Sequence, residues 1–103
     1  MLPVSKPKLL PSDFDLTKTL PEWQVNQATQ ELVRIFEFKD FKSAFEFMTL
    51  CANVAEELDH HPDWSNAWNK VSVRLSTHSM KALTELDIAM ASAMDQYALQ
   101  VLS

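Results

Sequence analysis

The sequence of 103 residues contains no glycine and only one cysteine, Cys51. Phosphate-binding loops, dinucleotide-binding fingerprints and the G-x-S-x-G nucleophile elbow are therefore excluded, because these motifs depend on glycine for a close backbone approach or a special turn. Left-handed backbone positions must be taken by other residues, and we expect asparagine there, for example Asn26, Asn66 or Asn69. A single thiol cannot form an internal disulfide, which favours a reducing compartment.

The sequence is also poor in basic residues. Nine Lys and Arg residues stand against fourteen Asp and Glu residues, which gives a net charge of −5 at pH 7. Proteins that bind nucleic acids usually carry a basic patch or stripe, and none is apparent, so we expect no nucleic-acid partner. No stretch has the length and hydropathy of a signal peptide or a membrane span. We therefore expect a soluble, cytoplasmic protein without a membrane partner.

The predicted elements follow the order strand, strand, helix, strand, strand, helix. Four of the five prolines lie in residues 1–21, which we interpret as an extended lead-in, and residues 22–103 are interpreted as a single domain. The strands are predicted at 22–27, 31–38, 63–68 and 71–77, and the helices at 40–58 and 85–101. Strands so close in sequence form hairpins. We therefore predict an α+β fold, with a four-stranded antiparallel sheet and helices packed on one face.

The predicted helix at 40–58 has an unusually broad apolar surface. One apolar stripe contains Phe41 and Phe45, and a neighbouring stripe contains Phe47 and Cys51. Together they span roughly 220° of the helical wheel, whereas a helix at a protein surface usually has an apolar stripe of about 100°. Packing on one sheet does not need so broad a face. We expect another helix or another subunit to cover the remainder.

Two of the three histidines are adjacent, in the sequence EELDHHPDW. His60 and His61 lie where the helix is predicted to end, and Pro62 restricts His61 to an extended conformation. His78 follows a predicted strand, so the two segments could reach a common cleft. Imidazole gives or takes a proton near neutral pH. The cluster therefore predicts proton transfer without a covalent intermediate.

Three carboxylates are candidate partners of these histidines. Glu56 precedes His60 by four residues and could orient its ring, although Glu56 and Glu57 could equally be solvated residues at a helix end. Asp87 lies three residues after Thr84, the predicted N-cap of the last helix. A capping box alone explains an aspartate at this position, so Asp87 is first of all interpreted as a helix cap.

Other residues have ordinary interpretations. Trp64 is first of all a packing residue, although an aromatic ring beside a histidine could stack on a flat ligand. Cys51 lies within the apolar arc of its helix and is interpreted as a small buried hydrophobe. A zinc site is the rival interpretation of the three histidines, but adjacent histidines do not fit the H-x-x-x-H spacing that aligns ligands on a helix. We expect no metal.

The segment EELDHHPDWSNAWNKVSVRLSTHSMKALTELD resembles the signature of the pterin-4a-carbinolamine dehydratases. That signature has an acidic residue, a His-His-Pro sequence, an aromatic residue, a later histidine and an aspartate. The matching residues are Glu56, His60, His61, Pro62, Trp64, His78 and Asp87. FKDFKSAFEFMT is similar to the family's first long helix, and the resemblance covers roughly residues 20–100. The loop SMKAL departs from the pattern, because relatives often carry glycine there.

The resemblance implies a hydro-lyase that removes water from a 4a-hydroxytetrahydropterin and forms a quinonoid dihydropterin. Such an enzyme supports the recycling of a tetrahydrobiopterin-type cofactor, and it needs no metal or organic cofactor of its own. His60 and His78 would be the proton donors and acceptors. His61 would mainly hold the pterin ring.

The resemblance also implies supporting roles and partners. Glu56 would orient His60, Asp87 would set the tautomer of a histidine or line the site, and Trp64 would form a wall of the pocket. Relatives are homodimers or homotetramers, which would cover the excess apolar arc. Some animal members bind a homeodomain transcription factor as a dimerisation cofactor, so a binding module is the alternative function.

Overall fold

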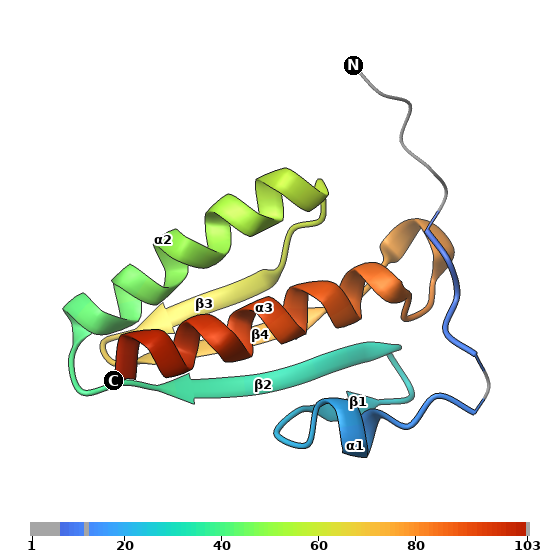
Figure 1. Ribbon diagram of the computed structural model, residues 1–103, viewed down its shortest axis with the longest axis horizontal. Coiled ribbons are helices and arrows are strands. Elements are labelled where there is room, and N and C mark those ends of the chain that lie inside the picture. The colour runs from blue at the N-terminus through green and yellow to red at the C-terminus, as the bar shows by residue number, and fades with distance from the viewer. Residues whose placement is uncertain (1–6, 12, 103) are drawn as a thin grey trace.

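The computed structural model describes residues 7–11 and 13–102; residues 1–6, 12 and 103, and with them the beginning of the predicted lead-in, lie outside the described part. The elements are α1 (Leu16–Thr19), β1 (Gln24–Asn26), β2 (Glu31–Glu37), α2 (Phe41–Leu58), β3 (Asp63–Ala67), β4 (Lys70–Leu75), the 3₁₀ turn η1 (His78–Met80) and α3 (Glu85–Leu102). The strands pair antiparallel in the order β1-β2-β4-β3, and α2 and α3 cover one face of the sheet (Figure 1). The predicted α+β fold with a four-stranded antiparallel sheet is confirmed.

The core lies between the sheet and the two long helices. In β4 the buried residues Val71, Val73 and Leu75 alternate with exposed ones, as a strand with one covered face requires. Leu32 of β2 pairs with Leu75, and Phe36 pairs with Val71, so the apolar rows continue across the sheet. The residues of α2 and α3 that pack on these rows are Ala44, Phe47, Cys51, Ala55, Met90, Ala91, Met94 and Ala98.

Helix α2 begins and packs as the sequence predicts. Asp40 caps it by accepting the N–H of Ser43 at 2.8 Å, and this hydrogen bond lowers the pKa of the Asp40 carboxyl. One side of the broad apolar arc faces the core and α3. The other side stays open in a single chain, where Phe41 is 48% and Phe45 is 54% exposed.

The left-handed backbone positions differ from the expectation. They fall on Gln30, Asp59, Trp68 and Lys81, with φ between 49° and 54°. The prediction of asparagine at these positions is wrong. The asparagines support the turns with their side chains instead: Asn26 Oδ1 accepts the N–H groups of Ala28 and Thr29, and Asn69 Nδ2 donates to the carbonyl of Phe38.

The N-terminal segment is more structured than an extended lead-in. Asp15 caps the short helix α1, which the sequence did not predict because four residues are too few to show a helical period. Leu20, directly after α1, is only 2% exposed. Further back, Leu9 forms an antiparallel β-bridge with Thr84, directly before α3. This part of the chain therefore packs against the start of α3.

Candidate active site

The end of α2 determines where the two adjacent histidines lie. Asp59, directly after the helix, adopts a left-handed backbone with φ 50° and ψ 45°. Its N–H donates to the carbonyl of Glu56, and the N–H of His60 donates to the carbonyl of Ala55 at 3.0 Å. These two bonds form a Schellman motif, which closes the last helical turn and changes the direction of the chain. The histidines therefore lie outside the helix.

His60 is largely buried and contacts α3. Its side chain is 10% exposed, and its Nε2 lies 2.6 Å from Oδ1 of Asp87, a fully buried residue. Oδ2 of Asp87 accepts the N–H of Thr84 at 2.9 Å, which is the reciprocal bond of a capping box. The same carboxylate therefore caps α3 and contacts a histidine. Its role in setting the tautomer of a histidine or lining the site stays a prediction.

His61 has an exposed partner. Its Nε2 lies 2.6 Å from Oε2 of Glu56, with the two side chains 56% and 77% exposed. The predicted pairing of Glu56 with His60 is therefore wrong. That prediction assumed a helical spacing of four residues, whereas the helix ends before residue 60.

His78 lies at the other side of the site, as the first residue of η1. Its loop is closed at the base by an isolated β-bridge, in which the N–H of Thr77 donates to the carbonyl of Ala82 at 3.2 Å. Within the loop Lys81 takes a left-handed backbone, with φ 50° and ψ 40°. Lys81 thus adopts a conformation that glycine adopts more readily.

The three histidines line one cleft of about 600 Å³. His60 and His61 reach it from the end of α2, and His78 reaches it from η1. Leu58 and Leu86 contribute apolar surface from the two long helices. Two segments that are distant in sequence are thus brought together at one concave surface, while the chemical roles of the imidazoles stay predictions.

Trp64 is placed differently from the expectation. It lies on β3 opposite Val73, is half-buried and packs against the hydrophobic core. Among the residues that the structure describes, those lining the histidine cleft do not include Trp64. Its interpretation as a packing residue agrees with this position. The suggested wall of the histidine pocket does not.

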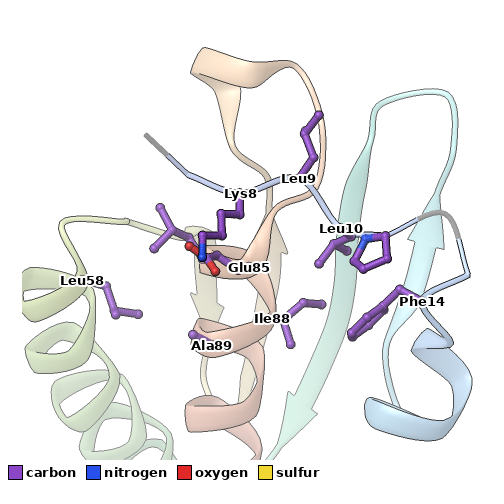
Figure 2. A pocket seen from close by; sticks show the side chains of 10 residues that line it. Lys8, Leu9, Leu10, Phe14, Leu58, Glu85, Ile88 and Ala89 are labelled. Atoms are coloured by element: carbon purple, nitrogen blue, oxygen red, sulfur yellow. The ribbon is translucent and has the colours of Figure 1, made fainter. Parts of the chain in front are cut away.

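A second cavity, of about 710 Å³, adjoins the histidine cleft. Figure 2 shows that Leu10 and Phe14 of the N-terminal segment and Ile88 of α3 lie around it. The two cavities share three lining residues: Leu58, Glu85 and Leu86. A ligand in the cleft would therefore lie beside an apolar groove.

Other groups that could carry chemistry lie elsewhere. Cys51 is fully buried, and this burial raises the pKa of its thiol to about 12, so it stays protonated at neutral pH. Within residues 7–11 and 13–102, no group of three or more His, Cys, Asp and Glu side chains is arranged to hold a metal ion. In the same part of the chain, no helix combines the length and apolar character needed to cross a membrane.

Two buried hydroxyls beside the site, those of Thr77 and Thr84, are not among the site residues predicted from the sequence. Oγ1 of Thr77 donates to Oδ2 of Asp87 at 2.8 Å, and it lies 2.6 Å from Oγ1 of Thr84. The sequence predicts Thr84 only as a helix cap and Thr77 only as the last residue of the strand at 71–77. The available signals were that Thr77 directly precedes His78 and that Thr84 lies three residues before Asp87.

Similar proteins are known, and a family model covers most of the chain. The family model described as pterin 4 alpha carbinolamine dehydratase matches residues 10–97. A protein of Synechococcus sp. (strain WH7803) is 48% identical over 80 residues, which are 78% of this chain and 84% of that protein. A protein of Brucella ovis is 49% identical over 81 residues, covering 79% and 84% of the two chains. The names of both proteins place them among the pterin-4-alpha-carbinolamine dehydratases.

Two solved structures are similar. The crystal structure of a transcriptional coactivator/pterin dehydratase from Brucella melitensis superposes with a TM-score of 0.79 at 44% identity, covering 88% of this chain and 99% of that one. A pterin dehydratase-like RuBisCO assembly factor of the α-carboxysome shares the fold at a TM-score of 0.66 and 21% identity, with 78% and 93% covered. From the match to the family model and these identities, we conclude that the chain belongs to the pterin-4a-carbinolamine dehydratase family.

Proposed function

We propose that the chain catalyses the dehydration of a 4a-hydroxytetrahydropterin to a quinonoid dihydropterin, which serves the recycling of a tetrahydrobiopterin-type cofactor. The observation that carries this proposal is the meeting of three imidazoles from two segments in one cleft. The cleft, of about 600 Å³, lies within the usual size range of small-molecule sites. Family membership supports the choice of a pterin as the ligand.

The reaction requires two proton transfers. The bond between C4a and the hydroxyl oxygen breaks, and the hydroxyl leaves as water after it receives a proton from an acid. A base removes the proton from N5, and the electron pair of that N–H bond forms the double bond between N5 and C4a. The two transfers balance, so the reaction needs only groups that can give and accept protons, and each transfer typically contributes about 10²–10⁴-fold to the rate.

The contacts suggest how the histidines divide this work. We assign the base to His60: with Nε2 bonded to Asp87, its Nδ1 is the ring nitrogen left to meet a ligand. His78 is assigned as the acid that protonates the leaving hydroxyl. His61, which is exposed beside Glu56, is assigned to hold the flat ring. Under this assignment each of the two segments supplies one of the proton-transfer groups.

A stopped-flow assay of 4a-hydroxytetrahydropterin dehydration tests the proposal. Wild-type protein should accelerate the loss of the 4a-hydroxypterin absorbance, and a chelator should leave the rate unchanged. The double variant His60→Ala/His78→Ala should lose the acceleration while its circular dichroism stays that of the wild type. Full activity in this double variant would refute the assignment.

A binding module for another protein is the second candidate function. Phe41 and Phe45 leave an apolar surface on α2, and a similar structure is named a transcriptional coactivator/pterin dehydratase. We propose first that this surface joins copies of the chain in a homodimer or homotetramer. Sedimentation of the wild-type protein should then show at least a dimer. The variant Phe45→Glu should shift the equilibrium toward the monomer. A wild-type protein that is a stable monomer at micromolar concentration would contradict the proposed self-association. Co-purification of a different protein from the native cells would favour the binding module.

A further inference from the structure

The carboxylate of Asp87 is buried and accepts hydrogen bonds on both oxygens. Oδ2 accepts the hydroxyl of Thr77 at 2.8 Å and the N–H of Thr84 at 2.9 Å, and Oδ1 lies 2.6 Å from Nε2 of His60. Asp87 and Thr84 are 0% exposed, and Thr77 is 4% exposed. A buried carboxylate needs such partners, because water cannot solvate it. These bonds exceed what a helix cap requires.

The hydroxyl groups of this network can point in only one direction. Thr77 has a single hydroxyl hydrogen, and that hydrogen is given to Asp87. The 2.6 Å contact between the two threonine hydroxyls must therefore use the hydrogen of Thr84. The oxygen of Thr84 is then an acceptor for the N–H of Leu86, at 3.3 Å. Every hydrogen in the chain of bonds thus points toward Oδ2 of Asp87.

This direction decides the tautomer of His60. Oδ2 of Asp87 accepts two donors, so Oδ1 is the oxygen that faces Nε2 of His60. A carboxylate oxygen can only accept a hydrogen bond, so the Nε2–H of His60 is the donor in this contact. The proton of a neutral His60 ring is held on Nε2, and Nδ1 keeps its lone pair for a ligand.

Thr77 also connects His60 to His78. It directly precedes His78, and its N–H donates to the carbonyl of Ala82, which closes the base of the loop that carries His78. Its side chain at the same time holds Asp87, the partner of His60. The backbone and side chain of one residue therefore fix both segments of the cleft.

We propose that Thr77 and Thr84 are positioning residues, which hold His60 in its Nε2–H tautomer through Asp87 and fix the loop of His78 against it. The effect on catalysis rests on the proposed function, whereas the effect on the tautomer does not. Six hydrogen bonds among the described residues hold this arrangement together.

The test compares Thr77→Val, which removes the hydroxyl but keeps the shape, with Thr77→Ser, which keeps the hydroxyl. The imidazole ¹⁵N shifts, with the His60 signals assigned from a His60→Gln spectrum, report the tautomer of His60 in each protein. Thr77→Val should lower the share of the Nε2–H form and lower kcat/KM of dehydration about tenfold, the effect of one hydrogen bond to a charged group. Thr77→Ser should restore both. The control Thr49→Val removes an exposed hydroxyl on α2 and should change neither.

The outcomes separate the two proposals. An unchanged His60 tautomer in folded Thr77→Val, or a Ser variant that behaves like the Val variant, overturns the positioning role. If Thr77→Val unfolds, the ¹⁵N spectra of the wild type and of Thr77→Ser still test the proposal. Both proteins must then show His60 in the Nε2–H form, and its absence from either overturns the positioning role. A wild-type protein that shows this tautomer and its loss in Thr77→Val, yet does not dehydrate the pterin, refutes the proposed function and supports the positioning role.

Discussion

The two histidine–carboxylate pairs at the end of α2 have the same length and very different surroundings. His60 and Asp87 lie 2.6 Å apart with side chains 10% and 0% exposed, whereas His61 and Glu56 lie 2.6 Å apart with side chains 56% and 77% exposed. The buried pair joins two elements, and further hydrogen bonds hold its carboxylate. The exposed pair joins neighbouring residues at one helix end. Distance alone therefore does not say which imidazole is fixed.

The difference in burial indicates which pair can fix the orientation of an imidazole. Water and salt screen an exposed ion pair, and its long side chains keep much of their freedom, so such pairs contribute about 0–1 kcal/mol. Removing one partner of a buried pair instead leaves an uncompensated polar or charged group, at about 3–5 kcal/mol. We therefore expect the geometry of His60 to be more sensitive to its partner than the geometry of His61.

The largest expected effect comes from exchanging each carboxylate for its amide. Asp87→Asn should lower kcat/KM of dehydration by about 10²-fold or more, because the amide can impose the wrong tautomer on His60. Glu56→Gln should lower it by less than about fivefold, the value of an exposed pair. Stopped-flow assays on both variants, with circular dichroism as a check of folding, measure this. Equal losses of kcat/KM in the two variants would show that the buried pair is no more important for catalysis than the exposed pair.

The buried thiol of Cys51 sharpens the comparison of buried and exposed titratable groups. Burial raises the pKa of its thiol from 9.0 to about 12, so the unfolded chain loses this proton at lower pH than the folded protein does. Stability should therefore fall as pH rises through this interval, with a contribution of about 1.4 kcal/mol per pH unit from this group. Urea unfolding of wild type and Cys51→Ala between pH 9 and 11 measures it. The variant should show the shallower slope, and parallel slopes would contradict the prediction.

The smallest effect concerns Asp59, whose left-handed backbone directs His60 inward and leaves His61 outside. Asp59→Gly should raise the free energy of unfolding by up to about 1 kcal/mol, because glycine adopts this conformation without strain. The matched control Glu57→Gly lies inside the helix and should lower stability by about 1 kcal/mol. Urea unfolding distinguishes the two. A loss of stability in Asp59→Gly would show that the Schellman motif is not strained at this residue.

The sequence predicted the fold well, because periodicity is a local signal. The alternation in β4 and the stripe of α2 that contains Phe47 and Cys51 directly reflect which face is covered. The pairing of side chains was harder to predict. Glu56 and His60 are four residues apart, but this spacing brings side chains together only on a continuous helix, and the backbone of Asp59 ends it.

The contact between His60 and Asp87 had no local signal at all. These residues are 27 positions apart and meet only because α2 and α3 lie side by side on the sheet (Figure 1). Trp64 is the converse case, in which closeness in sequence suggests a contact that the fold does not make. An aromatic residue near two histidines in sequence points to a shared pocket, yet its strand register directs it to the core opposite Val73.

The contact between the N-terminal segment and α3 has a practical consequence. The N–H of Glu85, in the first turn of α3, donates to the carbonyl of Lys8 at 3.0 Å, beside the bridge between Leu9 and Thr84. A purification tag or a shortened form that disturbs residues 7–10 would loosen the helical turn that carries Asp87. Affinity tags for this protein are therefore better attached after α3, because Asp87 lies in the first turn of this 18-residue helix and not in its last.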